Sequence, residues 1–320
     1  MKLPFISKPG EISNNDYHNS PEYAEFCSSS MLKLMLVSPK YARYKIDNPD
    51  KDDQTEAMSQ GSVYHSMLAS LTNHGDLSEF EREYFVFTPP KNPTTGSSYG
   101  FATKAYQEAL TDATASNQGK EACSEDQKKI AESMIDELLH GNPHLSPTIR
   151  NLIKIGQAEQ SHFLEYQGQK FKYRTDLKTA KKIVDWKKTK LESPKQDKFS
   201  REIDKYNYHI SAAFYQFFEF ILTGTWKDFF WVVQESEPPF DFLIHSTSEW
   251  TYNIFHKEGT VEMMPGAMRF QKLLEFWILC SERKEWPGYS IFIQPDWKKQ
   301  RIAFPEIPGY TLKNDFEFFE

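Results

Sequence analysis

The chain has 320 residues and a mass of 37.4 kDa, with 39% hydrophobic and 26% charged residues. This length and balance suit a folded globular protein with a core of its own, and they exclude disordered, collagenous and repeat chains. The net charge of −7 argues against a protein that coats nucleic acid without specificity.

The three cysteines, Cys27, Cys123 and Cys280, are widely separated, which excludes a CxxC zinc site and a four-cysteine iron–sulfur cluster. Unpaired cysteines favour a reducing setting. The opening residues lack a basic stretch followed by an apolar one, and no run approaches the ~18 apolar residues of a membrane span. We therefore expect a cytoplasmic protein without a secretory leader or membrane contact.

Charge is unevenly distributed along the chain. Residues 170–205 contain 13 Lys or Arg against 6 Asp or Glu, so this basic strip carries +7 while the remaining chain carries −14. Such a strip is either an ordinary solvated face or a surface that contacts DNA phosphates.

The first half of the chain has mainly helical patterns. Residues 1–26 are rich in turn formers, and we expect an irregular arm there. Ser124 and Gln127 form a capping-box start for a helix that Gly141 ends. The other helices are expected over 31–45, interrupted at Ser38-Pro39, over 56–71, over 101–115 after a loop at 89–100, and from 146 onward.

The pattern changes near Glu159. Strands are expected at 161–166 and 170–175, joined through Gln167-Gly168-Gln169, and then at 182–187, 229–235 and 240–245. Helices are expected at 201–222 and 265–283. This order predicts an α/β fold with a central mixed sheet flanked by helices, in a single domain over 27–290 followed by a C-terminal extension over 291–320.

One stretch carries recognisable chemistry. Asp176 closes one predicted strand, and Asp185 and Lys187 lie two residues apart on the next, so they share a face of the sheet. Two carboxylates and an ammonium group in this arrangement suit metal-assisted hydrolysis. However, Asp-x-Lys is common by chance, and a charged hairpin edge explains it more often than a metal site does.

The neighbouring segments favour the metal site. GSVYHSML, RTD, VDWKKT, YNYHISAAFY, ESEPPF and WPGY occur in this order between residues 61 and 289. Together they resemble the nuclease domain of RecE-type exonucleases (exodeoxyribonuclease VIII), within the PD-(D/E)xK superfamily. No single segment is specific, but six in this order are.

The resemblance implies roles for particular residues. His65, Asp176 and Asp185 match metal-binding positions, and Lys187 matches the catalytic lysine. Trp186 would contribute only its backbone carbonyl to the metal. Glu159 resembles a further acidic position of the family, for which Glu165 competes.

His65 has an ordinary alternative, because a lone histidine on a helix is most often structural. Gly61, four residues earlier, frees the helix surface beside it, and this favours the ligand role.

One position departs from the family. RecE-like nucleases carry Gln-x-x-x-Tyr on the helix after the Asp-x-Lys strand, whereas Ser211 and Tyr215 occupy those positions here. Serine cannot make the same amide contacts, which puts substrate positioning in doubt more than metal binding. His209 or Gln216 could compensate, and the phenylalanines nearby are expected to be core residues.

The basic strip lies around the expected catalytic strands and therefore suits DNA phosphates. The candidates for these contacts are Lys178, Lys181, Lys182, Lys188 and Lys190.

The resemblance implies a Mg²⁺-dependent exonuclease, with one or two ions and Mn²⁺ as a substitute, that digests linear double-stranded DNA from its ends in the 5′-to-3′ direction. It also implies a role in phage or prophage recombination, a homotetramer, and a RecT-like single-strand annealing partner. A restriction-type endonuclease and a catalytically impaired DNA-binding protein remain alternatives. The chain has no GxxxxGK[ST] phosphate loop, so no motor activity is expected.

Overall fold

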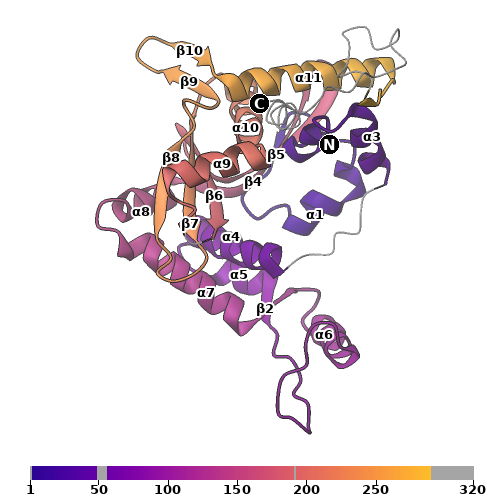
Figure 1. Cartoon of the computed structure of the whole chain (residues 1–320), viewed down its shortest axis with the longest axis vertical. Helices are drawn as coiled ribbons and strands as arrows, with labels where there is room; N and C mark the ends of the chain where they lie inside the picture. Colours follow the sequence, from indigo (N-terminus) through magenta and orange to yellow (C-terminus); the bar gives the residue numbers. More distant parts are fainter. Residues whose placement is uncertain (1, 49–55, 191, 290–320) are drawn as a thin grey trace, which may run out of the picture.

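The computed structural model describes residues 2–48, 56–190 and 192–289, so the expected extension over 291–320 lies outside the described residues. A six-stranded sheet has the strand order β1-β4-β5-β6-β7-β8 (Figure 1). Only β6 and β7 are parallel neighbours, and the predicted mixed sheet is confirmed. The strands span Phe5–Ile6 (β1), Gln157–Tyr166 (β4), Gln169–Lys178 (β5), Lys182–Thr189 (β6), Asp228–Glu235 (β7) and Phe242–Ser246 (β8).

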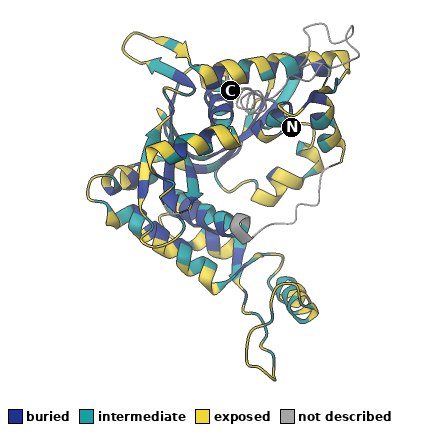
Figure 2. Ribbon diagram, viewed as in Figure 1, coloured by how far each residue is buried: buried dark blue, intermediate teal, exposed yellow. Residues whose placement is uncertain are grey.

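Helices cover both faces of the sheet, as predicted. One face packs against α4 (Glu56–His74), α7 (Glu125–Asp136) and α8 (Ser146–Ile155). The other packs against α2 (Ser29–Leu34), α9 (Gln196–Tyr206), α10 (Tyr208–Thr223) and α11 (Pro265–Arg283). Buried residues accordingly concentrate in the sheet and on the inner sides of these helices (Figure 2).

The part of the chain before β4 is mainly helical, also as predicted. Its further helices are α1 (Asn14–Asn19), η1 (Pro21–Tyr23), α3 (Pro39–Asp47), α5 (Ser78–Glu83), α6 (Lys104–Ser116) and the π-helical turn η2 (Glu137–Gly141). Two short strands, β2 (Tyr84–Val86) and β3 (Glu121–Cys123), form a parallel pair, and the unpredicted hairpin β9–β10 (Tyr252–Phe255, Thr260–Met263) precedes α11.

Local signals place several helix and strand ends correctly. Ser124 accepts a hydrogen bond from the Gln127 backbone, and the Gln127 side chain returns one, which completes the predicted capping box of α7. Ser38 caps α3 and separates it from α2. Gln167 and Gly168 have φ values of 48° and 71°, which suit the tight turn between β4 and β5.

The prediction of one helix over 201–222 is wrong. Asn207 lies in the left-handed region with φ 53° and separates α9 from α10. Asparagine adopts this conformation at small cost, so a helical pattern can run through it while the backbone turns. The two helices together form the crossover that parallel neighbours β6 and β7 require.

The prediction of an irregular arm over residues 1–26 is also wrong. This N-terminal segment contributes β1 to the sheet edge, where Phe5 pairs with Phe163. Tyr17 and Phe26 are buried and contact the Phe163 ring at centroid distances of 6.2 and 5.2 Å. Scattered aromatic residues do not show a period, so the sequence pattern missed this small cluster.

Residues 87–120 form an arm that projects from the base made by β2 and β3 (Figure 1). Its helix α6 has no buried residue, and its loop and helix agree with the predicted order. Figure 2 shows the arm as mostly exposed or half-buried.

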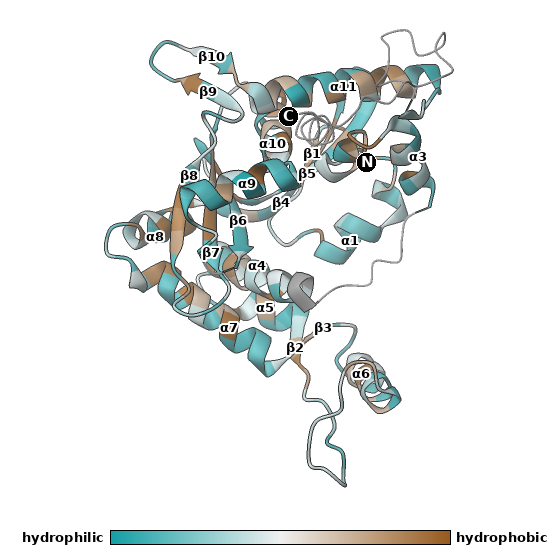
Figure 3. Ribbon diagram, in the orientation of Figure 1, coloured by the Kyte–Doolittle hydropathy of each residue, from teal (hydrophilic) through white to brown (hydrophobic). Residues whose placement is uncertain are grey.

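Hydropathy follows the layers. In Figure 3 the helices α1 and α9 are mostly hydrophilic, and the strands near β7 are mostly hydrophobic. Within the described residues, no helix combines the length and apolar character that crossing a membrane requires.

Phe163 provides a test of the N-terminal cluster. Its fully buried ring contacts four aromatic rings of the segment, so Phe163→Ala should lower the free energy of unfolding by about 3–5 kcal/mol, as measured by denaturant titration. Phe101→Ala, at a ring that is 68% exposed, is the matched control and should change it by less than about 0.5 kcal/mol. Equal effects of the two substitutions would contradict the packing described here.

Candidate active site

Three neighbouring strands bring three carboxylates together. The pairs Ala158↔Leu177 and Gln160↔Thr175 place Glu159 opposite Asp176 on β5. The β5–β6 ladder ends at Leu177↔Val184, and one step further along the same register Asp185 comes opposite Asp176. Residues opposite each other in antiparallel strands project to the same side, so the predicted strand positions do converge.

The backbone of β6 orients Asp176. Its Oδ2 accepts a hydrogen bond of 2.8 Å from the Trp186 backbone N–H, just past the last β5–β6 pair. The Trp186 side chain is buried in the core beneath α4. Its backbone is therefore held between the strands, next to the site where its carbonyl is the expected metal ligand.

Histidine 65 reaches the same place from α4. Its Nδ1 lies 3.6 Å from Asp176 Oδ2. Burial and the nearby Lys187 lower the pKa of His65 to about 4, against a weaker opposing contribution from a hydrogen bond to the Trp186 backbone. The imidazole is therefore neutral at physiological pH, which is the form that ligates metals.

One ligand atom each from His65, Glu159 and Asp176 lie within 4.8 Å of one another, an arrangement that could hold a metal ion. Two carboxylates with one imidazole form a donor set that suits Mg²⁺ or Mn²⁺. The predicted ligands His65 and Asp176 are thus brought together. Asp185 lies outside this group, and its Oδ2 is 2.5 Å from Lys187 Nζ instead.

Glu159 has an unusual backbone that suits a functional position. Its φ of 51° is rare for a residue other than glycine, and it interrupts the β4 pairing at this point. The competing candidate, Glu165, is exposed and pairs with Lys170 at the turn end of the hairpin, away from the cluster.

The cluster is electrostatically unfavourable without a cation. Burial raises the pKa of Glu159 to about 7, with Arg174 opposing and Glu83 adding to the effect. Burial and the neighbouring Asp185 also raise the pKa of Asp176 well above its usual value. A bound divalent ion would remove both penalties, which is the behaviour expected of metal ligands.

Lys187 stays charged beside these carboxylates. Burial alone would lower its pKa, but Asp185 and Asp176 outweigh burial and raise it. Its Nζ also lies 5.0 Å from the centre of the Tyr208 ring. A permanently protonated lysine suits charge stabilisation rather than proton abstraction.

Ser211 and Tyr215, at the family's Gln-x-x-x-Tyr positions, both lie on α10. Tyr215 borders the cavity. Burial raises its pKa well above the usual value, with smaller contributions from Tyr17 and Asp185, so the hydroxyl keeps its proton. Ser211 is half-buried one turn earlier on α10, and it does not border the cavity.

The five candidate DNA-binding lysines separate into three groups. Lys178 is only 8% exposed and forms ion pairs with buried Glu219, so its prediction as a phosphate contact is wrong. Lys182 starts β6, about 16 Å along the strand from Lys187, and Lys181 directly precedes it. Lys188 and Lys190 lie next to the end of β6 that carries Lys187, and both remain candidates for DNA phosphate contacts.

The basic strip failed as a single surface because Lys172 and Arg174 are also buried. Their cationic groups donate hydrogen bonds to backbone carbonyls of the N-terminal segment, at Tyr17 and Ile12 respectively. Charge along the sequence alone does not distinguish an exposed lysine from one that docks a neighbouring segment.

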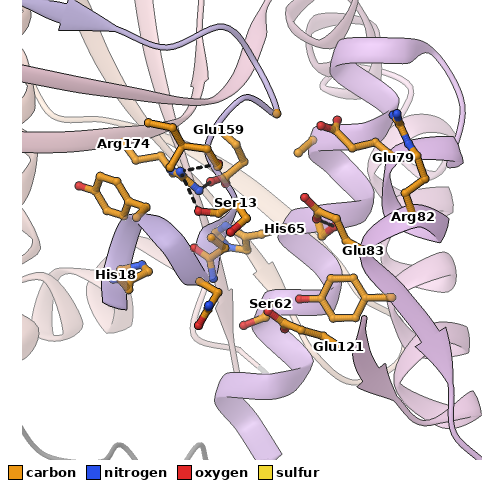
Figure 4. A pocket seen from close by; sticks show the side chains of 18 of the residues that line it. Ser13, His18, Ser62, His65, Glu79, Arg82, Glu83, Glu121, Glu159 and Arg174 are labelled. Atoms are coloured by element: carbon orange, nitrogen blue, oxygen red, sulfur yellow. Dashed lines mark hydrogen bonds and ion pairs between the residues drawn. The ribbon is translucent and has the colours of Figure 1, made fainter. Parts of the chain in front are cut away.

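A cavity of about 640 Å³ opens onto His65, Glu159 and Asp176. The N-terminal segment forms one wall and α4 and α5 form another, as Figure 4 shows. Arg174 lies between them, 3.7 Å from Glu159 and bonded to the Ser161 hydroxyl. Sequence reasoning included Arg174 in the RTD segment but gave it no role, and it missed the acidic wall residues Glu79 and Glu83.

Comparison with known proteins agrees with this geometry. Residues 28–290 match the model of a family described as "PDDEXK-like domain of unknown function (DUF3799)". The fold and the clustered acidic residues are those of the PD-(D/E)xK nuclease class. The chain belongs to this family of PDDEXK-like domains.

One similar solved structure is a protein from Eubacterium rectale that carries the provisional description of an exonuclease. It is 15% identical in sequence, the match covers 94% of this chain and 98% of that one, and the TM-score is 0.52, so the likeness concerns the fold. No curated protein sequence matches the chain.

Glu159→Gln should stabilise the metal-free protein and weaken its binding of a divalent ion. A carboxyl with a raised pKa stabilises the fold below about pH 4.5 and loses that contribution as pH rises through about 7. Removing the charge should therefore stabilise the metal-free protein by roughly 1–3 kcal/mol at pH 8 and leave stability at pH 4 unchanged.

The same substitution should weaken Mn²⁺ binding at least about tenfold, measured by electron paramagnetic resonance without DNA. Glu165→Gln, at the exposed competitor, is the matched control and should change neither quantity. Normal Mn²⁺ binding by Glu159→Gln would show that Glu159 is not a ligand. Lower stability of this variant at pH 8 would show that burying the Glu159 charge is not unfavourable.

Proposed function

We propose that the protein is a Mg²⁺-dependent DNA exonuclease that hydrolyses phosphodiester bonds from the ends of linear double-stranded DNA. One observation carries this proposal: ligand atoms of His65, Glu159 and Asp176 lie close enough together to hold a metal ion, with the charged Lys187 nearby, in a PD-(D/E)xK fold. Mn²⁺ would substitute for Mg²⁺, and Asp185, which pairs with Lys187 in the structure, would be the carboxylate that holds a second ion.

The residues have separate tasks in this reaction. When bound, the divalent ion supplies Lewis-acid chemistry by lowering the pKa of a water molecule and polarising the phosphate. His65, Glu159, Asp176 and the Trp186 carbonyl would hold it, with Asp176 oriented by the Trp186 N–H. Lys187 would offset the charge that develops on the phosphate, since its ammonium group is retained at neutral pH.

The cavity has a wall on each side of the proposed metal site. The N-terminal segment lies across the site from α4 and is fixed to β5 by Arg174. Digestion from DNA ends itself rests on the resemblance to RecE-type exonucleases.

The finer features of the proposal rest on the resemblance to RecE-type exonucleases. These features are 5′-to-3′ polarity, a tetramer, a RecT-like annealing partner, a role in phage or prophage recombination and a cytoplasmic location. Lys188 and Lys190 would contact DNA phosphates near the site, while Ser211 would contribute less to substrate positioning than glutamine does in those relatives.

The test is digestion of linear duplex DNA labelled at the 5′ or the 3′ end, with Mg²⁺ or with EDTA. We expect Mg²⁺-dependent release of the 5′ label. Lys187→Ala should reduce the rate roughly 10²–10³-fold, because the developing charge loses its nearest cation. Lys181→Ala, directly before β6 and distant from Lys187, should leave the rate within about twofold of wild type.

Closed circular DNA distinguishes the alternatives. The exonuclease should leave it intact, whereas cleavage of the circle would indicate a restriction-type endonuclease. Binding of linear DNA without cleavage in any divalent metal would identify a catalytically impaired DNA-binding protein and overturn the proposal.

A further inference from the structure

The junction of α9 and α10 presents an exposed aromatic ring close to the catalytic lysine. Tyr206 ends α9 and is 45% exposed, while Tyr208 begins α10 and packs against the core. Asn207 between them is in the left-handed conformation, which turns both tyrosines to one side. Their rings are stacked with centroids 5.4 Å apart and planes 29° apart.

The stacked pair connects directly to the site. Lys187 Nζ lies 5.0 Å from the centre of the inner ring, Tyr208, and the outer ring, Tyr206, follows at 5.4 Å. The outer ring is therefore within about three base steps of Lys187, since stacked bases along a strand are about 3.4 Å apart.

Two further cations contact Tyr206, one at its ring and one at its backbone. Lys205 Nζ lies 4.7 Å from the centre of Tyr206, and Lys33 Nζ donates a hydrogen bond of 3.3 Å to the Tyr206 backbone carbonyl. Burial lowers the pKa of Lys33, and the charge on nearby Lys187 lowers it further, so Lys33 lies close to the site. None of these three residues was a predicted DNA contact.

An exposed aromatic ring with lysines close by is an arrangement that binds single-stranded nucleic acid, because bases stack on the ring and lysines contact the phosphates. A purely structural role would not need the outer ring. Tyr208 already fills the core position, and the exposed contact between Lys205 and Tyr206 is weaker than base stacking, so a base can displace it.

We propose that Tyr206 is a stacking platform for a base of single-stranded DNA next to the catalytic site, with Lys33 and Lys205 contacting the flanking phosphates. This inference rests on the proposed nuclease function, because it says how a single strand of the DNA substrate is held next to that site. The Asp-x-Lys signature indicates none of these three residues, and only Lys205 lies within the basic strip.

The test is binding of a single-stranded oligonucleotide in Ca²⁺, measured by fluorescence anisotropy, so that no cleavage is needed. Tyr206→Ala should raise the dissociation constant about 5- to 100-fold, whereas Tyr206→Phe, which keeps the ring, should stay within about twofold of wild type. Tyr44→Ala, at a tyrosine on α3 that is 60% exposed, is the matched control and should have no effect.

A spectroscopic signature separates stacking from a structural role. A 2-aminopurine base placed at successive positions of the strand should be quenched at one position by wild type and Tyr206→Phe but not by Tyr206→Ala. Normal affinity of Tyr206→Ala, equal loss in Tyr206→Phe, or no binding by wild type would each overturn the platform.

The binding and cleavage results are independent. Cleavage with no effect of Tyr206→Ala on binding would leave the nuclease standing without the platform. Ring-dependent binding without cleavage would leave the platform standing without the nuclease.

Discussion

Burial of three neighbouring carboxylates on adjacent strands, together with their mutual repulsion, decides how the site is organised. Glu159, Asp176 and Asp185 are brought together by the β4–β5–β6 register. In the absence of a cation the fold satisfies them only in part, through the Trp186 N–H, Arg174 and Lys187. Binding of a divalent ion would remove the unfavourable free energy of burying these charges, and this would strengthen the binding.

The surrounding core fixes this geometry from both sides. On α4, the residue before His65 is the buried Tyr64, whose hydroxyl donates a hydrogen bond to Gln234 on β7. Gln234 in turn donates to the Met134 carbonyl on α7, so α4, β7 and α7 are joined beneath the site. On the other side, Arg174 fixes the N-terminal segment to β5. Both connections are buried and polar, which favours one arrangement over others.

Much of the fold and part of the site could be predicted from the sequence. The Asp-x-Lys spacing, the capping box of α7 and the tight turn before β5 are local signals, and each placed its residues correctly. The N-terminal strand, the break at Asn207 and the burial of Lys178 depend on contacts with distant residues, which no local period records. Glu159 could be ranked above Glu165 only when the strand register was known.

Anomalous X-ray scattering from crystals of the protein grown with Mn²⁺ would locate the ion itself. We expect a peak at about 2.0–2.2 Å from ligand atoms of His65, Glu159 and Asp176. A peak at the acidic wall of Glu79 and Glu83, or no peak at saturating Mn²⁺, would contradict this expectation.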